Sequence, residues 1–120
     1  MQETLIKAQE VASKIIIEAG NIAKDRFDQS YSIEEKDDFG DVVTEVDHLA
    51  EDVILKELSR VFPDHRIHSE EAGDNGLESD WLWMIDPLDG TNNFAIGFPI
   101  FSVSITLLYK REPVLGVIYE

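Results

Sequence analysis

Apolar residues recur at every third or fourth position in two stretches of the chain, the spacing that places them on one face of an α-helix. The first stretch runs from Glu3 to about Phe27, and the second runs from Val46 to Pro63, where a proline ends the pattern. The apolar positions of the first stretch are Leu5, Ala8, Ala12, Ile15, Ile16, Ala19, Ile22 and Ala23. Those of the second are Val46, Leu49, Ala50, Val53, Ile54, Leu58 and Val61. The sequence therefore predicts two amphipathic helices that bury these positions.

The segment between these helices is polar and irregular, which predicts a loop or hairpin tip from Gln29 to Gly40. It is followed by DVVTEV, residues 41–46, a short β-branched run that predicts a strand. Thr44 and Asp47 have the spacing of a capping box, which places the second residue in the first turn of the next helix. An acid in that position stabilises the helix dipole even when it has no further role.

Two shorter segments each end in carboxylates. RIHSEE predicts a strand that ends on Glu70 and Glu71, and the polar loop AGDNGLESD follows it. WLWMI, residues 81–85, is a continuous apolar run that is typical of a strand covered on both faces, and it leads directly into Asp86. Buried carboxylates are costly unless a positive charge or hydrogen bonds compensate them.

The C-terminal segment predicts an antiparallel hairpin. FSVSITLLY alternates between two faces, the turn KREP follows, and VLGVIY is a second apolar strand. The predicted order is helix, strand, helix, strand, strand and hairpin, without an internal repeat or a low-complexity segment. This order predicts a single domain over residues 1–120, of the α/β (α+β) class, in which helices are layered on a sheet.

Composition narrows the function classes. The 120 residues are 43% hydrophobic and carry a net charge of −15, which indicates a globular protein and argues against nucleic acid or an anionic membrane as partner. A phosphorylated ligand would need a bound cation or focused backbone N–H groups to reverse the local sign of the field. The chain has no cysteine, which excludes a thiolate zinc site and a cysteine nucleophile. Without a signal peptide or an apolar run of the roughly 20 residues that a membrane span needs, we expect a soluble cytoplasmic protein.

Four carboxylates occupy the predicted strand ends and helix start: Asp47, Glu70, Asp86 and Asp89. Such ends gather at one edge of a sheet, which is where open α/β folds bind ligands, so we expect these side chains to converge. Two like charges about 4 Å apart repel by about 4 kcal/mol at an effective dielectric near 20. A divalent cation removes this repulsion, and a set of oxygen donors without thiolates suits Mg²⁺.

The turn DPLDGT, residues 86–91, offers groups for both a metal and a phosphate. Asp86 and Asp89 provide carboxylates, and the Leu88 carbonyl can turn inward. Gly90 lets the backbone approach an anion, and Thr91 is placed to open a short helix whose free N–H groups receive phosphate. Two metal ions about 3.5 to 4 Å apart polarise a phosphate ester and activate water. The pattern favours hydrolysis of a phosphate monoester.

The DPLDGT turn and the two nearby histidines also allow other interpretations. DPLDGT is also compatible with a polar β-turn after a core strand. A calcium loop is excluded, because the twelfth position counted from Asp86 is Gly97 rather than Glu. An aspartyl-phosphate phosphatase also runs a strand into Asp-x-Asp-Gly-Thr, but here two residues rather than one separate Asp86 from Asp89. His65 and His68 are expected to be packing or surface residues rather than metal ligands.

Three motifs, in this order, resemble the inositol monophosphatase family of magnesium-dependent, lithium-sensitive phosphatases. They are DVVTEVD at 41–47, SEE at 69–71 and WMIDPLDGTNNF at 83–94, and the later segments FPIFSVSI and GVIY also resemble the family. The resemblance covers essentially the whole chain. It implies a layered α-β-α sandwich of the sugar phosphatase type, two or three Mg²⁺ ions as cofactors, a small phosphorylated substrate and a homodimer.

The resemblance also implies roles for individual residues. The implied metal ligands are Glu70, Asp86, the Leu88 carbonyl and Asp89, with Asp86 bridging two ions. The implied catalytic residues are Thr91 and Asp47, which would orient the attacking water. The implied phosphate-binding residues are Leu88, Asp89, Gly90 and Thr91. Lys36 resembles a family lysine near the metal site, and Glu71 is the alternative to Glu70, because the pattern alone does not separate the two.

The chain departs from the family in one respect. Family members continue into a second half with a WD motif, whose aspartate completes the second metal site, and with most contacts that select the alcohol; here Trp81 and Trp83 are followed by Leu82 and Met84. Residues 1–120 therefore resemble the N-terminal, metal- and phosphate-binding portion, with the C-terminal half absent. The expected substrate is inositol monophosphate or a related sugar phosphate. The alternatives are a non-catalytic metal-binding half-domain, and a superfamily phosphatase acting on fructose bisphosphate, nucleotide 3'-phosphate or NADP.

Overall fold

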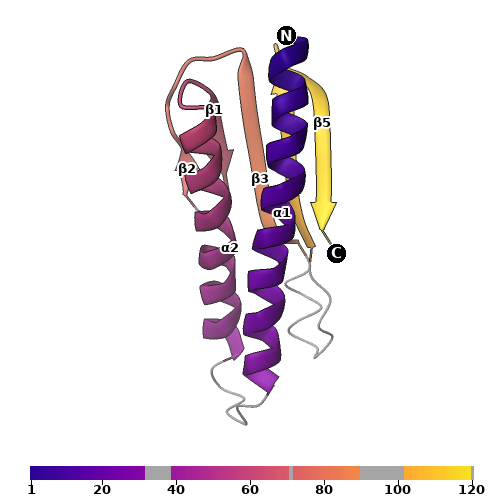
Figure 1. Cartoon of the computed structure of the whole chain (residues 1–120). Coiled ribbons are helices and arrows are strands. Elements are labelled where there is room, and N and C mark those ends of the chain that lie inside the picture. The colour runs from indigo at the N-terminus through magenta and orange to yellow at the C-terminus, as the bar shows by residue number, and fades with distance from the viewer. Residues whose placement is uncertain (32–38, 71, 90–101, 120) are drawn as a thin grey trace.

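The computed structural model describes residues 1–31, 39–70, 72–89 and 102–119, with side chains for 1–25, 48–70, 72–86 and 102–119. Two helices lie side by side against one five-stranded sheet (Figure 1). The helices are α1 (Gln2–Tyr31) and α2 (Phe39–Val61). The strands are β1 (Arg66–Ser69), β2 (Gly73–Asp74), β3 (Trp81–Asp89), β4 (Ser102–Tyr109) and β5 (Glu112–Tyr119).

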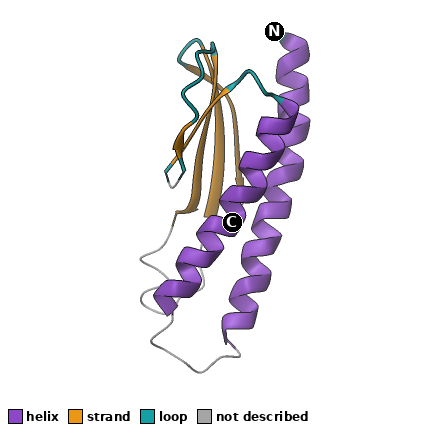
Figure 2. Ribbon diagram, turned by 90° about the vertical axis from the view of Figure 1, so that its left-hand side faces the viewer, coloured by secondary structure: helices purple, strands orange, loops and turns teal. Residues whose placement is uncertain are grey.

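The sheet has the strand order β2-β1-β3-β4-β5. β1 and β3 are parallel, whereas the other neighbours are antiparallel. The helix pair covers one face of the sheet, so that the described residues form two layers (Figure 2). α1 packs against α2, β4 and β5, and α2 also contacts β3. These layers belong to the α/β architecture that the sequence predicts.

The core lies between the helix pair and the sheet. The predicted apolar stripe of α1 is confirmed, because its buried members are Ala8, Ala12, Ile15, Ile16, Ala19 and Ala23. α2 contributes Ala50, Ile54 and Leu58, and the sheet contributes Ile67, Trp83, Ile85, Val103, Ile105 and Leu107. Burying each large apolar side chain stabilises the fold by roughly 1.5 to 3 kcal/mol. Small alanines on α1 leave room for a close approach of the helices.

The predicted strand at residues 41–46 is wrong, because these residues lie within α2, which begins at Phe39. Asp47 accordingly lies in the interior of α2 rather than in its first turn, and Thr44 is not a cap. β-branched residues lower helix propensity by only a few tenths of a kcal/mol each. The three-and-four spacing of apolar residues continues upstream through Phe39, Val43 and Val46, and this amphipathic pattern outweighs the local preference. The predicted loop is shorter at both ends for the same reason, since α1 extends to Tyr31.

The expectation that WLWMI is covered on both faces is also wrong for the described residues. Trp83 and Ile85 are buried under the helices, but Met84, which points to the other face, is 44% exposed. The strand is also longer than predicted, because β3 continues through the acidic residues to Asp89. β2 was missed within the polar loop, because two residues without an apolar pattern give no strand signal.

The predicted C-terminal hairpin is confirmed as β4 and β5. Lys110 and Arg111 form its tip with positive φ angles of 50° and 71°. Positive φ at both central residues is the type I′ geometry that matches the twist of paired strands. Glu112 and Pro113, which were expected in the turn, belong to β5. Of the helices that the structure describes, none is long and apolar enough to cross a membrane.

Candidate functional site

The parallel pairing of β1 with β3 brings two of the predicted metal ligands to neighbouring positions. The last register pair is Ser69 with Ile85, and the next residues along the two strands are Glu70 and Asp86. Adjacent strands lie about 4.8 Å apart, so the two chain positions lie next to each other at the C-terminal edge of the sheet. The Glu70 side chain is exposed, and that of Asp86 is half-buried. Two acidic residues thus occupy neighbouring chain positions at the edge where the sequence predicts a ligand site.

A bulge in β3 lies within the predicted metal-binding turn. The register with β4 passes from Pro87–Val103 to Asp89–Ser102, so Leu88 is the extra residue. A bulged residue is left out of the regular ladder of hydrogen bonds and bends the strand locally. This backbone geometry suits the predicted use of the Leu88 carbonyl as a ligand. The side chains of Leu88 and Asp89 lie outside the described set, so their roles stay predictions.

Asp47 lies on α2 four residues, or about one helical turn, before Glu51, so the two Cα atoms share one face of that helix. The structure does not describe the Asp47 side chain, and its predicted role in orienting water stays a prediction. Lys36, Glu71, Gly90 and Thr91 lie outside the described residues altogether.

Glu51 is a residue near the site that the sequence analysis missed. Its side chain is 2% exposed, and its Oε1 accepts hydrogen bonds from the Ser69 hydroxyl and from the Ala72 N–H, the latter at 2.8 Å. A signal was present in the sequence: Glu51 precedes Ile54 by three residues and Leu58 by seven, which places a charge on the apolar stripe of the helix. An acid at a core position of an amphipathic helix indicates a specific buried partner.

A metal centre fits the donors that the structure places at this edge. Glu70 and Asp86 provide carboxylate oxygens, and oxygen donors are what Mg²⁺ prefers. Among the side chains that the structure describes, no group of three His, Cys, Asp or Glu residues is arranged to hold a metal ion. Two of the predicted ligands belong to that set, whereas the Asp89 side chain does not. The described side chains therefore include two of the predicted ligands, Glu70 and Asp86, and the complete ligand set stays a prediction.

His65 is a packing residue, as expected. Its Nδ1 accepts a hydrogen bond of 3.0 Å from the Trp83 indole, and its ring stacks between Phe62, at 4.6 Å between centroids, and Trp81, at 5.5 Å. Desolvation by burial lowers the pKa of His65, and the nearby Asp64 partly opposes this shift. His68 is exposed, with its Nδ1 3.6 Å from the Asp74 carboxylate. Both imidazoles therefore have roles within β1 and its surroundings.

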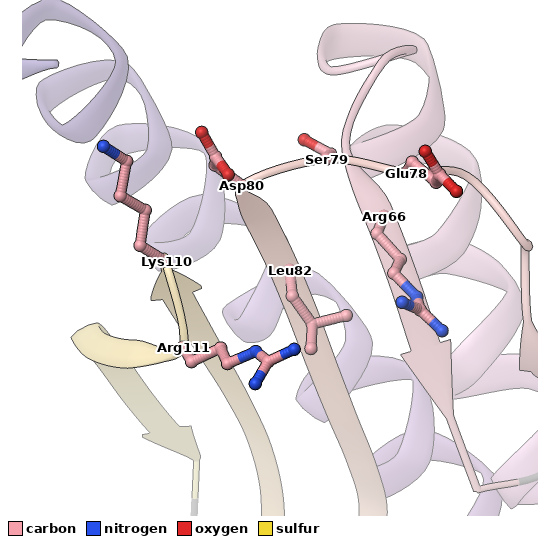
Figure 3. A pocket seen from close by; sticks show the side chains of 7 residues that line it. All are labelled: Arg66, Glu78, Ser79, Asp80, Leu82, Lys110 and Arg111. Carbon is pink, nitrogen blue, oxygen red and sulfur yellow. The ribbon is translucent and has the colours of Figure 1, made fainter.

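A groove of about 740 Å³ lies at the opposite end of the sheet (Figure 3). It is lined by Arg66, Glu78, Ser79, Asp80, Leu82, Lys110 and Arg111, which lie at the starts of β1 and β3 and at the tip of the β4–β5 hairpin. β1 and β3 run away from this end towards Glu70 and Asp86, so the groove is separate from the predicted site. Arg66 is already paired with Asp74, through Nε at 2.9 Å.

Comparison with known proteins shows what this chain is similar to in sequence and in fold. The sequence profile of the inositol monophosphatase family matches residues 4–120. The fructose-1,6-bisphosphatase/inositol-1-monophosphatase of Aquifex aeolicus is 41% identical over 98% of this chain and 45% of its own length. The inositol-1-monophosphatase of a Synechocystis strain is 42% identical over 92% of this chain and 39% of its own length.

The fold is shared with the solved structure of an inositol monophosphatase. The inositol monophosphatase of an Anabaena (Nostoc) strain superposes with a TM-score of 0.76 at 37% identity, and the match covers 97% of this chain and 40% of that one. The chain thus spans less than half the length of the relatives it matches. On the family profile, the sequence identities and the shared fold, this chain belongs to the inositol monophosphatase family.

Proposed function

We propose that this chain forms the metal- and phosphate-binding part of a magnesium-dependent phosphomonoesterase, whose substrate is inositol monophosphate or a related sugar phosphate. The observation that carries the proposal is the parallel pairing of β1 and β3, which brings Glu70 and Asp86 together at one edge. Family membership supports the reaction class, because the relatives are named as phosphatases of inositol monophosphate and fructose 1,6-bisphosphate.

The proposed ligands of the metal are Glu70, Asp86, the Leu88 carbonyl and Asp89. Mg²⁺ held there would offset the charge of the carboxylates and would supply Lewis acidity towards the phosphate ester and a water molecule. The chain carries a net charge of −15, so an anionic substrate depends on this local reversal of sign. The Gly90 and Thr91 N–H groups are proposed to hold the phosphate, and these residues leave the choice of alcohol to other parts of the site.

The protein side of the reaction is assigned to two residues. The Thr91 hydroxyl accepts a hydrogen bond from the attacking water. Asp47, on α2, orients the Thr91 hydroxyl. Lys36 is proposed to lie near the metal. We further propose a homodimer in the cytoplasm and sensitivity to lithium, on the same family basis. Two or three Mg²⁺ ions are expected per site.

A second candidate function follows from the length of the relatives. Because the chain spans 39–45% of the two curated relatives described, it is also suited to be a metal-binding half-domain that does not turn over substrate on its own. Fructose bisphosphate remains an alternative substrate, since one relative carries that name. Nucleotide 3'-phosphate and NADP are the further alternatives within the superfamily.

The test is a magnesium titration of phosphate release from inositol monophosphate by this chain. Asp86→Asn removes one charge at the C-terminal end of β3 and should abolish turnover and magnesium-dependent stabilisation. Asp80→Asn is the matched control, because Asp80 is an exposed acid immediately before the start of the same strand. Magnesium-dependent stabilisation without turnover would establish the half-domain instead. Turnover that is unchanged by Asp86→Asn would refute the proposed site.

A further inference from the structure

The carboxylate of Glu51 is buried at a place where a charge is costly. It is 2% exposed, within a helix face that otherwise contributes Ala50, Ile54 and Leu58 to the core. Taking a carboxylate out of water is unfavourable unless hydrogen bonds or an opposite charge compensate it. Glu51 Oε2 is buried without a hydrogen-bond partner among the described residues. A group retained at this cost calls for a specific role.

The contacts of Oε1 identify that role. Oε1 accepts from the Ser69 hydroxyl, at the last residue of β1, and from the Ala72 N–H, and the Ser69 hydroxyl itself accepts from the same Ala72 N–H at 3.2 Å. Ser69 is 1% exposed, so the hydrogen bond between its hydroxyl and Glu51 is buried, whereas Ala72 lies at the exposed edge of the triangle. Its two anchor points, Ser69 and Ala72, precede and follow Glu70 along the chain. Glu51 therefore holds the backbone on both sides of Glu70.

Anchoring Ser69 and Ala72 restricts the positions that Glu70 can take between them. Ordering backbone costs conformational entropy, and a ligand that binds a preordered site does not have to supply that free energy. Hydrogen bonds to an ionised carboxylate are about twice as strong as neutral ones, which suits an anchor of this kind. Glu51 also lies one turn after Asp47, so the same helix sets both positions.

We propose that Glu51 is a positioning residue, which holds Ser69 and Ala72 against α2 and thereby sets Glu70 for metal binding. The inference rests on the proposed function, since it assigns Glu70 to the metal. Glu51 acts through these two residues and does not itself contact the ion. A cation held by Glu70 would also offset part of the cost of burying the Glu51 carboxylate.

Two variants of Glu51 separate the hydrogen bonds from the charge. Glu51→Gln keeps an acceptor oxygen for Ser69 and Ala72, whereas Glu51→Ala removes it, and both remove the same charge. Asp52→Asn is the control for long-range charge, because Asp52 is the exposed neighbour on the same helix. The probe is Mn²⁺, which oxygen-donor sites bind like Mg²⁺, and the free ion is counted by electron paramagnetic resonance.

We expect Glu51→Ala to weaken Mn²⁺ binding about tenfold or more, the size typical of residues that orient metal ligands. Glu51→Gln should stay within about threefold of the unmodified chain, and Asp52→Asn within about twofold, since an exposed charge is largely screened. A direct measure of this anchoring is the hydrogen exchange of the Ala72 amide. It should accelerate in Glu51→Ala but not in Glu51→Gln, while the Leu107 amide in the core of β4 stays unchanged.

Three outcomes would overturn the inference: equal losses in both Glu51 variants, unchanged Mn²⁺ affinity in Glu51→Ala, or unchanged exchange at Ala72. If Glu51→Ala does not fold by circular dichroism, Ser69→Ala tests the same triangle, and unchanged Mn²⁺ affinity and Ala72 exchange there would refute it. Asp86→Asn distinguishes the proposed metal site from the positioning role of Glu51. Mn²⁺ binding that does not depend on Asp86 refutes the proposed metal site, whereas Asp86-dependent binding that ignores Glu51 refutes the positioning role alone.

Discussion

Gly20 allows a sharp test of how α1 packs on the sheet. A Cβ atom at this position would lie 2.5 Å from Cγ and Cδ1 and 2.6 Å from Cδ2 of the Tyr119 ring. Carbon atoms in contact prefer about 3.5 to 4.0 Å, so the ring or the backbone must move by about 1 Å. These ring atoms lie close to the main chain of β5, and the Tyr119 hydroxyl also donates to the Asn21 side chain at 3.3 Å. The ring therefore has little freedom to turn away.

Two effects of Gly20→Ala oppose each other. Replacing glycine with alanine in a helix stabilises it by about 1 kcal/mol. Overpacking costs about 1 to 3 kcal/mol, and overlap with three ring atoms places this site near the upper end of that range. We therefore expect Gly20→Ala to lower the free energy of unfolding by about 2 kcal/mol, as the difference between the two effects.

The assay is urea denaturation followed by circular dichroism, with a double-mutant cycle. In the Tyr119→Ala background the overlap is gone, so Gly20→Ala should stabilise by up to about 1 kcal/mol. Gly116→Ala in β5 is the control, because among the described residues no heavy atom other than those of its chain neighbours lies within 4 Å of a Cβ built there. A Gly20→Ala variant as stable as the unmodified chain, or one with the same effect in both backgrounds, would refute the packing argument.

Two further predictions concern local features. The pKa of His65 is lowered in the folded state, so its contribution to stability is present above its ordinary pKa and is lost as pH falls through the folded-state value. The melting temperature should thus fall as the pH is lowered below about 6.5, the ordinary pKa of histidine, and His65→Gln should flatten that dependence. A residue other than glycine in a left-handed backbone conformation costs roughly 1 to 2 kcal/mol of stability. Glycine avoids this cost, but it also makes the unfolded chain more flexible, which offsets about 1 kcal/mol of the gain. Arg111→Gly, at a φ of 71°, should therefore stabilise by up to about 1 kcal/mol in urea, and lower stability would contradict this account.

Some predictions from the sequence failed, each for a different physical reason. DVVTEV has the composition of a strand, yet it lies in α2, because the apolar spacing of the helix extends upstream to Phe39. β2 was missed because it is two residues long and is held by pairing with β1 and by the Arg66–Asp74 ion pair rather than by an apolar pattern. Met84 is exposed although it sits in a continuous apolar run, because the helices cover only the Trp83 face in the described structure.

The sequence by itself determined the features that depend on neighbours along the chain. The buried faces of α1 and α2, the hairpin of β4 and β5, and the family motifs can all be read from spacing and residue type, because helix and strand periodicities are local. The tertiary structure alone decided that β1 lies parallel to β3, so that Glu70 and Asp86 become neighbours. It also decided that Glu51 reaches Ser69 and Ala72. Both depend on contacts between distant segments, which form only when packing of the shared core selects one arrangement of helices and strands.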